Sequence, residues 1–397
     1  MDLRFGTQYE ELRGELRAFL AGNWNAEEQD GGPDLRRKEV AFRKCAIQRG
    51  YLARGVPRKY GGSEQPPDPF RGVIVGQEFA AVGAPQDVQP PVTQLIPTLL
   101  EHGTDWQKER LLPATVSGEM HWCQGYSEPG SGSDLASLRT RAELVGDEWV
   151  ISGQKIWTTG AQRAEMMYLL CRTEPDAGKH AGISYLLLDM KQPGVSVSPL
   201  DTLNGAAEFS QVFFDDARTP ADHLVGRRGG GWLVSRSTLA HERGTAAVTA
   251  TASGRKEFEE LVALAAQTLR DGRPAIEDQS IRQRLAEIDG YLTAHEYSTY
   301  IQLTCAARGE DPGPVGMMNK LVSTDIGHSV AKLVIDLLGD SALHAPSSDA
   351  PARSTGMRQY LGSLGVAIAA GTSNIQRNII GERALGLPRD FAVQKKG

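Results

Sequence analysis

The chain has 397 residues, of which 40% are hydrophobic and 23% are charged, a composition typical of a globular protein with two or three domains. The net charge of −6 gives no electrostatic reason to expect nucleic acid or an anionic membrane as a partner, and no apolar run is long enough to span a membrane. The four cysteines form no close pair in the sequence and no H-E-x-x-H or C-x-x-C motif occurs, so we expect reduced thiols, no metal site and a cytoplasmic protein.

Residues 1–118 are expected to form a helical N-terminal domain. Leu12, Leu16 and Leu20 recur at the spacing of one helix face, and residues 106–112 are another short amphipathic run. Proline clusters at 66–69 and 90–91 separate the helical pieces. This segment carries no obvious chemistry, so we expect it to serve as scaffold and pocket wall.

Residues 119–225 change to short β-rich runs bounded by turn residues, which is the pattern of a compact β-barrel. The expected strands include 166–171, 183–188, 195–197 and 211–214. Before them, residues 148–151 and 154–158 are expected to form a β-hairpin around a turn at Ser152 and Gly153. On the return strand, Trp157 and Thr159 are expected to share one face, because side chains of a strand alternate with period two.

Residues 226–397 are expected to be mainly helical. After a glycine-rich break at 227–231, the expected helices cover 232–270, 281–306, 314–338 and 360–369. Ser373 and Gln376 have the spacing of a capping box and predict a helix start near Asn374. Helices, then strands, then helices is an α+β plan rather than an alternating βαβ plan.

Two stretches of the β-rich segment are candidates for a cofactor site. Small residues in the loop 126–134, Tyr-Ser-Glu-Pro-Gly-Ser-Gly-Ser-Asp, would let backbone N–H groups approach an anion or the polar edge of a flat cofactor. The strand 153–159, Gly-Gln-Lys-Ile-Trp-Thr-Thr, offers a ring that can stack and a hydroxyl two positions away. Either stretch alone is more often a surface turn or a core strand. In this order and spacing they resemble the FAD-binding signature of the acyl-CoA dehydrogenase family.

The resemblance extends over essentially the whole chain and implies an N-terminal α-helical domain, a middle β-barrel domain and a C-terminal four-helix bundle. It implies FAD as cofactor, an acyl-CoA thioester as substrate and an electron-transferring flavoprotein as electron acceptor. Ser133, Arg243 and the backbone N–H of Ala370 match its substrate contacts, the last of which would polarise the thioester carbonyl. Arg243 has an equally good structural interpretation as a brace between its helix and a carboxylate. The positions that match the family's cofactor contacts are Gln124, Tyr126, Ser127, Gly132, Ser133, Trp157, Thr158, Thr159, Thr372 and Asn374.

The chain departs from the family at the catalytic base. Most members carry a glutamate in a Y-E-G-T loop, where this chain has Ala370, and an alanine cannot remove a proton. Glu242 is the candidate replacement. It shares one face of a predicted helix with Trp232, Ser235 and Leu239, where burial would raise the pKa of a carboxylate toward neutrality. Relatives of the isovaleryl-CoA type carry their base at this position; the alternative is that Glu242 pairs with a neighbouring cation or faces solvent.

The expected activity is α,β-dehydrogenation of the acyl group, and the alternatives are a flavin-dependent monooxygenase on the same fold and a non-catalytic subunit. The motifs most resemble the large subunits of bacterial dehydrogenases that act on steroid side-chain or pimeloyl-type CoA esters.

In the tetrameric family, a neighbouring subunit contributes R-x-x-F-G and Q-x-x-G-G-N-G motifs to the ADP half of FAD. Here residues 268–272 read Thr-Leu-Arg-Asp-Gly, without an arginine at the first motif position or a phenylalanine at the fourth. Residues 336–341 carry two acids, which would repel the pyrophosphate of FAD. We therefore expect an unlike subunit to complete the site of a tetramer. A homo-oligomer in which Arg270 substitutes is the alternative.

Overall fold

The computed structural model describes residues 6–25, 33–86, 92–343 and 356–388, apart from the side chains of residues 33, 92 and 242–252. The chain divides into two compact units. The first consists of Met1–Asp201 and Ala207–Glu242, and the second of Thr202–Ala206 and Arg243–Gly397. The long helix α6 (Gly231–Gln267) contributes its first part to one unit and its second part to the other.

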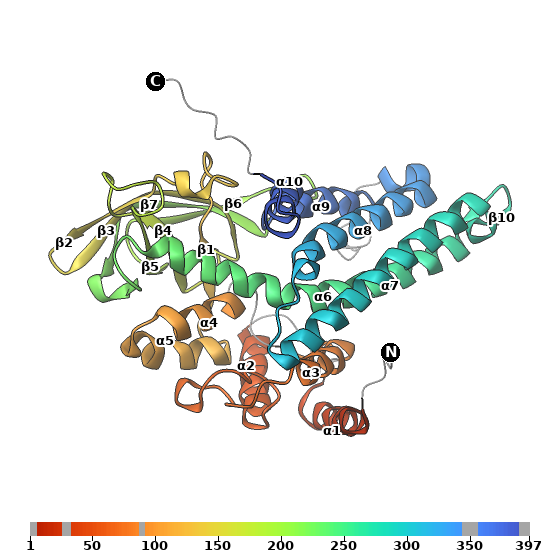
Figure 1. Cartoon of the computed structure of the whole chain (residues 1–397), viewed down its shortest axis with the longest axis horizontal. Helices are drawn as coiled ribbons and strands as arrows, with labels where there is room; N and C mark the ends of the chain where they lie inside the picture. Colours follow the sequence, from red (N-terminus) through yellow and green to blue (C-terminus); the bar gives the residue numbers. More distant parts are fainter. Residues whose placement is uncertain (1–5, 26–32, 87–91, 344–355, 389–397) are drawn as a thin grey trace. The chain divides into compact units, whose positions relative to one another are not determined.

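The N-terminal helices form around an apolar core of the first unit. Leu12, Leu16 and Leu20 are all buried, which confirms the predicted amphipathic helix, and the predicted run at 106–112 lies inside α5. Thr104 begins α5 with a capping box, in which Thr104 and Gln107 satisfy each other's backbone N–H groups. The helices are α1 (Thr7–Asn23), α2 (Pro33–Gln48), α3 (Pro69–Ala81), α4 (Val92–His102) and α5 (Asp105–Ser117), with short 3-10 turns at Arg58–Tyr60, Leu135–Ser137 and Ala221–His223 (Figure 1).

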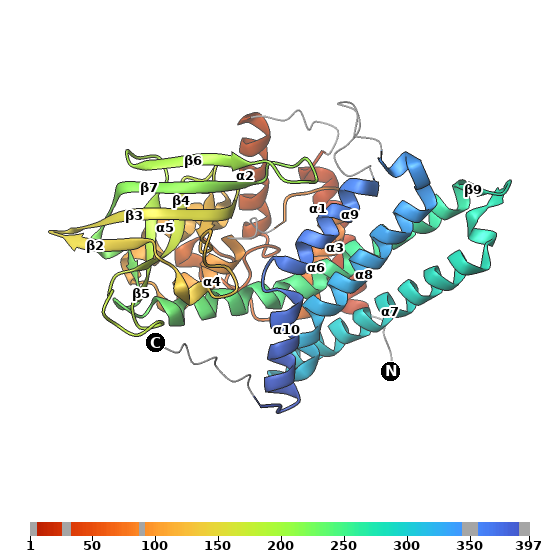
Figure 2. The ribbon, with the colours of Figure 1, turned by 90° about the horizontal axis from the view of Figure 1, so that it is seen from above.

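The strands of the first unit form one eight-stranded sheet. Its order is β6-β7-β3-β2-β4-β5-β8, and β1 pairs in parallel with β4. The neighbouring strands β6, β7, β3 and β2 lie side by side in Figure 2. The expected strand-rich middle domain is therefore confirmed. The strands are β1 (Trp122–Gly125), β2 (Arg141–Val145), β3 (Glu148–Thr159), β4 (Met166–Arg172), β5 (Ile183–Asp189), β6 (Val195–Leu200), β7 (Phe209–Pro220) and β8 (Leu224–Val225).

Strand β4 is buried on both faces, which explains the unbroken apolar run at 166–171. Met166, Tyr168 and Leu170 belong to the core that the N-terminal helices share, while Met167 and Leu169 belong to a second core. A strand covered on both faces needs apolar side chains at every position, because successive side chains point to opposite faces. The short strand β1, which leads into the loop 126–134, pairs with this strand and is held by it.

The predicted hairpin turn at Ser152 and Gly153 is wrong. Strand β3 runs through this point without a break, and its pairing with β7 shifts register between Ile151 and Gly153. Gly153 has φ of 145°, and a Cβ there would lie 2.7 Å from Cα of Thr140. A β-bulge needs the same glycine freedom as a tight turn, so the Ser-Gly pair was a false turn signal. The hairpin turn lies instead at residues 146–147, between β2 and β3.

A second bulge lies near the end of β3, between Lys155 and Thr158. Lys155 and Thr158 are both buried, whereas Trp157 and Thr159 are both exposed. One extra residue in the bulge changes the phase of the strand after Lys155, but from Trp157 to Thr159 exposed and buried residues alternate, as the expected common face of Trp157 and Thr159 requires. Both side chains are accessible, as a ligand-binding role requires.

The second unit is helical. The expected ranges 281–306 and 314–338 correspond to α7 (Gln279–Arg308) and α8 (Pro314–Leu338), and 360–369 falls largely within α9 (Gly356–Ile368). α10 (Ser373–Ile379) follows and ends in a π-helical turn at Ile380–Ala384. A two-stranded hairpin of β9 (Leu269–Arg270) and β10 (Arg273–Pro274) precedes α7. Buried side chains of α6, α7 and α8, among them Leu261, Leu285 and Val330, form the core of this unit.

Over the described ranges, no helix is both long and apolar enough to cross a membrane. Within the same ranges, no three His, Cys, Asp or Glu side chains lie together in a way that could hold a metal ion. All four cysteines are free thiols, as expected. Burial raises the pKa of Cys123 and of Cys171, so both are unreactive core side chains.

Candidate active site

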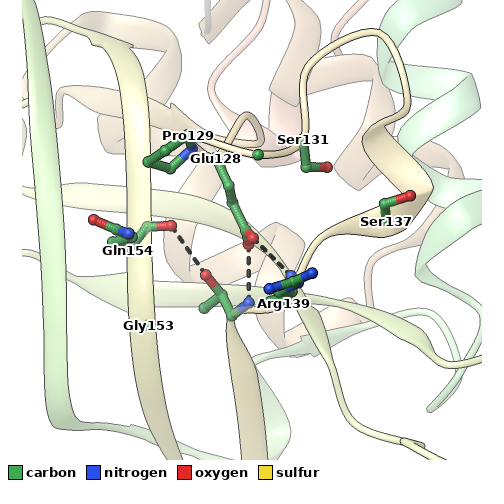
Figure 3. A pocket seen from close by; sticks show the side chains of 9 residues that line it. Glu128, Pro129, Ser131, Ser137, Arg139, Gly153 and Gln154 are labelled. Carbon is green, nitrogen blue, oxygen red and sulfur yellow. Dashed lines mark hydrogen bonds between the residues drawn. The ribbon is translucent and has the colours of Figure 1, made fainter.

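The two motif stretches of the first unit are fastened together by a buried ion pair. Lys155 Nζ lies 2.8 Å from Glu128 Oε1 and also donates to the carbonyl oxygen of Tyr126 at 3.0 Å. The Glu128 carboxylate accepts two further hydrogen bonds, from the backbone N–H of Arg139 at 2.6 Å and of Thr140 at 2.9 Å (Figure 3). Lys155 is fully buried and Glu128 is 8% exposed. The loop 126–134 is thus held on β3 by Glu128 and Lys155, two motif residues for which we predicted no role from the sequence.

The structure favours an ionised Glu128. Burial by itself would raise the pKa of Glu128, but the Lys155 ammonium and the N–H groups of Thr140 and Arg139 outweigh burial and lower that pKa. Burial lowers the pKa of Lys155, and the Glu128 carboxylate opposes this effect. Removal of one partner of a buried pair leaves an uncompensated charge, which typically costs about 3–5 kcal/mol. The pair is therefore a structural requirement of the loop rather than a surface contact.

Trp157 lies beside this loop in a strained backbone conformation. The N–H of Ile156 donates to the carbonyl oxygen of Ser127 at 2.9 Å, which brings Ser127 next to Trp157. Trp157 has φ of 61°, in the left-handed region that costs a bulky residue about 1–3 kcal/mol. Its side chain is 56% exposed and meets the ring of Phe209 edge-on, with ring centroids 5.8 Å apart. A strained and largely exposed tryptophan points to a ligand that covers it, because the chain itself gains little apolar burial from the ring.

Three buried polar atoms near this strand have no hydrogen-bond partner in the described part of the chain, namely Gln124 Nε2, Thr158 Oγ1 and Ser210 Oγ. Thr158 and Ser210 are directly opposite each other on β3 and β7. Buried polar groups are almost always paired, so these atoms leave hydrogen-bonding capacity for a bound group or an ordered water. Gln124 and Thr158 are predicted cofactor residues, but Ser210 was missed, because its place opposite Thr158 depends on the register of two strands that are distant in sequence.

Tyr126, another predicted cofactor residue, is part of the core. Its ring packs edge-on against Tyr168 and Tyr185, with centroids 5.8 and 6.4 Å away, and the latter two rings stack in parallel at 5.8 Å. Burial raises the pKa of Tyr185, so this phenol stays neutral. A contact between Tyr126 and a cofactor would therefore use its backbone.

The other predicted residues of the loop and strand are accessible. Ser127 is half-buried, and Gly132, Ser133 and Thr159 are exposed. A cavity of about 340 Å³ also lies against the loop, but none of the predicted cofactor residues lines it. Its lining consists of Glu128, Pro129, Gly130, Ser131, Ser137, Arg139, Thr140, Gly153 and Gln154 (Figure 3).

The first turns of α6 present a buried face that includes Val234, Ser235 and Thr238. Trp232 and Leu239 are half-buried and pack against the same core. Ser235, Trp232 and Leu239 are thus turned inward, as the predicted helix face requires. The direction of a helix face repeats about every 3.6 residues, so this face can be followed along α6.

Glu242 and Arg243, the predicted base and a predicted substrate contact, lie in α6. Residue 242 follows Thr238 by one turn and Ser235 by two turns. The side chains of Glu242 and Arg243 lie outside the described residues, so their roles stay predictions.

In the second unit, the chain turns sharply before α10. Ala370 and the glycine after it have φ of 50° and 87°, so two consecutive residues adopt the left-handed conformation. Thr372 then caps α10, and its Oγ1 accepts the N–H of Ile375 at 3.2 Å. The prediction that Ser373 caps the helix is wrong. Thr, Ser and Asn are all good N-cap residues, so residue type alone does not decide among Thr372, Ser373 and Asn374. The left-handed turn at residues 370–371 makes α10 begin one residue earlier than predicted. The Thr372 hydroxyl keeps a proton to donate, and Asn374 is exposed in the first turn of α10.

The two regions that depart from the family's ADP motifs are engaged in ion pairs within the second unit. Arg270 on β9 pairs with Asp278 at 3.5 Å, and Asp336 on α8 pairs with Arg284 at 2.5 Å. Asp271 and the following glycine make the tight turn of the hairpin, with φ of 50° and 78°. The charge of Arg270 is therefore partly committed to a neighbouring carboxylate.

Three family models match the chain. The N-terminal domain of acyl-CoA dehydrogenases matches residues 7–119, the middle domain residues 123–217 and the C-terminal domain residues 229–385. The chain is 38% identical to acyl-CoA dehydrogenase IpdE1 of Mycobacterium tuberculosis (strain ATCC 25618 / H37Rv), over 96% of this chain and 97% of that protein. It is 36% identical to acyl-CoA dehydrogenase FadE34 of the same strain, over 86% of this chain and 45% of that protein.

Solved structures agree with these matches. A structure described as the Tcur3481-Tcur3483 steroid ACAD is 30% identical with a TM-score of 0.80, and covers 98% of this chain and 100% of its own. The ChsE4-ChsE5 complex from Mycobacterium tuberculosis is 31% identical with a TM-score of 0.79, at the same coverage. On these matches, which span nearly its whole length, the chain belongs to the acyl-CoA dehydrogenase family.

Proposed function

We propose that this acyl-CoA dehydrogenase binds FAD and introduces a double bond between Cα and Cβ of an acyl-CoA thioester, with Glu242 as the base. The observation that carries the proposal is the strained and exposed Trp157, held beside Ser127 and next to the buried hydroxyls of Thr158 and Ser210, which have no partner among the described residues. Strain of this kind clusters at functional sites in proteins, and an exposed aromatic ring is available to stack on a ligand.

The residues around Trp157 fit FAD. A flat ring system would cover the exposed tryptophan, and the accessible hydroxyls of Ser127 and Thr159 would donate to its polar edge. When bound, FAD supplies the acceptor for the hydride that leaves Cβ. The unpartnered atoms of Gln124, Thr158 and Ser210 offer further hydrogen bonds to the cofactor or to waters around it. The remaining candidate contacts are Tyr126 through its backbone, Gly132, Ser133, Thr372 and Asn374.

Glu242 would take the α-proton of the thioester. Its position continues the buried face of α6 that Ser235 and Thr238 define, which supports a desolvated carboxylate. Desolvation raises the pKa of a carboxylate, so that it can act as a base near neutral pH. The α-proton passes to Glu242, the electron pair it leaves forms the new bond to Cβ, and Cβ loses its hydride. Ala370, where most of the family has its glutamate, cannot do this.

Ala370 would instead act through its backbone. An N–H group at the thioester carbonyl stabilises the negative charge that develops there as the α-proton leaves. The left-handed conformation of Ala370 supports this role, since it orients the backbone of a residue in a tight turn just before α10. Ser133 and Arg243 are the other proposed substrate contacts. The steroid enzyme among the similar structures suggests a bulky acyl group, and an electron-transferring flavoprotein would collect the electrons.

An unlike subunit is proposed to complete each site of a tetramer. Two of the similar structures are named for pairs of chains, Tcur3481-Tcur3483 and ChsE4-ChsE5. In this chain the region 268–272 lacks the family's arginine and phenylalanine, and Arg270 is paired with Asp278. A partner that carries the arginine motif would supply the missing donor for the pyrophosphate.

The proposal is tested by purifying the chain with a candidate partner, measuring its flavin content, and screening CoA thioesters with an artificial electron acceptor. The screen should include steroid side-chain and dicarboxylic acid thioesters. We expect an oxidised-flavin spectrum and reduction of the acceptor by a bulky thioester. A complex that ignores added FAD would contradict the cofactor assignment, and rapid oxygen consumption by the reduced protein would favour a monooxygenase.

A further inference from the structure

Helix α4 and the first part of α6, both in the first unit, are joined side chain to side chain at two levels. The inner contact is a buried hydrogen bond from Thr98 to Thr238, 3.0 Å long. The outer contact is made by Glu101, one turn after Thr98 on α4. Glu101 accepts a hydrogen bond from Ser237 and pairs with Nε2 of His241 at 2.9 Å. One carboxylate thereby holds two residues that lie a turn apart on the same side of α6.

These contacts fix the rotation of α6 about its own axis. A helix turns by about 100° per residue, so the place of every later residue around the axis follows from those of Ser237 and His241. Residue 242 comes directly after His241 and one turn after Thr238. Its position around the helix is therefore set by groups on α4.

We propose that Glu101 is a positioning residue, which holds Ser237 and His241, fixes the rotation of α6 and so keeps Glu242 at the reacting α-carbon. This inference rests on the proposed role of Glu242 as the base. Glu101 acts through α6 rather than on the substrate itself.

The charges at this contact favour the ionised form of Glu101. The hydrogen bond from Ser237 lowers the pKa of Glu101, burial opposes this, and His241 and His102 lower it further. His102 Nε2, on α4 itself, lies 3.6 Å from the carboxylate. The side chains of Glu101 and His241 are 47% and 31% exposed, and pairs of that exposure add little to the free energy of unfolding. A gain in stability therefore does not explain why Glu101 contacts Ser237 and His241. Alignment of α6 needs only that these contacts form, even if each contributes little free energy.

The test compares Glu101→Leu, which removes the acceptor, with Glu101→Gln, which keeps an acceptor oxygen. Glu109→Leu, at an exposed acid of the next helix, is the matched control. Each variant is assayed in the assembled enzyme with the CoA thioester that gives the highest rate in the screen. The readouts are kcat, KM and the exchange of the α-hydrogen of that thioester with D2O, which NMR follows without an electron acceptor. The exchange reports on removal of the α-proton without transfer of the hydride.

Glu101→Leu is expected to lower kcat and the exchange rate about tenfold with KM within about twofold, because a 1 Å misplacement of reacting groups can cost about 100-fold. Glu101→Gln should stay within about threefold of the wild type, and Glu109→Leu within about twofold. In a Glu242→Gln background, Glu101→Leu should cause no further loss, because the group it positions is gone. Ser237→Ala, a milder change that keeps all charges, should lower both rates by about threefold.

Equal rates for Glu101→Leu and Glu109→Leu would overturn the proposal, as would a loss that persists in the Glu242→Gln background. If Glu101→Leu does not fold, an unchanged exchange rate in Ser237→Ala overturns it instead. A different result would show that the proposed function itself is wrong: Glu242→Gln alone would then keep the wild-type exchange rate.

Discussion

Replacing Lys155 by methionine tests whether the buried ion pair holds the loop 126–134 in place. Methionine has nearly the length of lysine without its charge, so Lys155→Met leaves the Glu128 carboxylate buried with two backbone N–H donors and no cation. Loss of one partner typically costs about 3–5 kcal/mol, and the two remaining hydrogen bonds favour the lower end, about 3 kcal/mol. In a unit of this size about 1 kcal/mol shifts Tm by about 2–4 °C, so we expect Tm to fall by about 6–12 °C.

Thermal unfolding of the apo-protein, followed by circular dichroism, measures this loss. The double variant Lys155→Met/Glu128→Gln should recover part of it, because the uncompensated charge is gone. Arg218→Met is the control, since it breaks an exposed pair with Glu148 on the same sheet, and such a pair contributes about 0–1 kcal/mol. A fall in Tm no larger than that of Arg218→Met, or a double variant no more stable than Lys155→Met, would show that Glu128 does not depend on the Lys155 charge.

Three further predictions concern the same site. Trp157→Ala should change the stability of the apo-protein by less than about 0.5 kcal/mol, because the ring is 56% exposed, yet it should weaken flavin retention, which absorbance after gel filtration measures. Ser210→Ala removes a buried hydroxyl that has no partner among the described residues, so the apo-protein should unfold at the same or a higher temperature while flavin is lost more readily. The contribution of Glu128 to stability should be complete above pH 4.5 and should disappear as the pH falls through its lowered folded-state pKa; a Tm that falls with acid equally in Glu128→Gln would contradict this.

Much of the fold follows from periodicity that the sequence displays. Leu12, Leu16 and Leu20 repeat at helical spacing and all turn out buried, and α8 covers the predicted 314–338. The apolar run at 166–171 is visible because β4 is buried on both faces. The loop 126–134 and the strand 153–159 were recognisable because a fixed order of small, aromatic and hydroxyl residues carries the family signature.

What the sequence could not supply depends on register and on pairs distant along the chain. Gly153 has the same conformational freedom in a turn as in a bulge, and only the pairing of β3 with β7 distinguishes the two. Ser210 has no local signal, since its significance comes from lying opposite Thr158. The ion pair of Glu128 with Lys155 joins two motifs that are 27 residues apart in the sequence. The sequence did hold a signal for this pair, because one motif carries an acidic residue and the next motif carries a basic one.

The most direct test of the account is anaerobic mixing of the flavin-loaded complex with an active CoA thioester, followed by flavin absorbance in a single turnover. The flavin of the wild type should bleach rapidly. In Glu242→Gln, which should retain flavin, bleaching should slow by about 10²–10⁴-fold, and Ala370→Glu in that background should restore part of the rate. A Glu242→Gln complex that bleaches within tenfold of the wild-type rate would contradict the account.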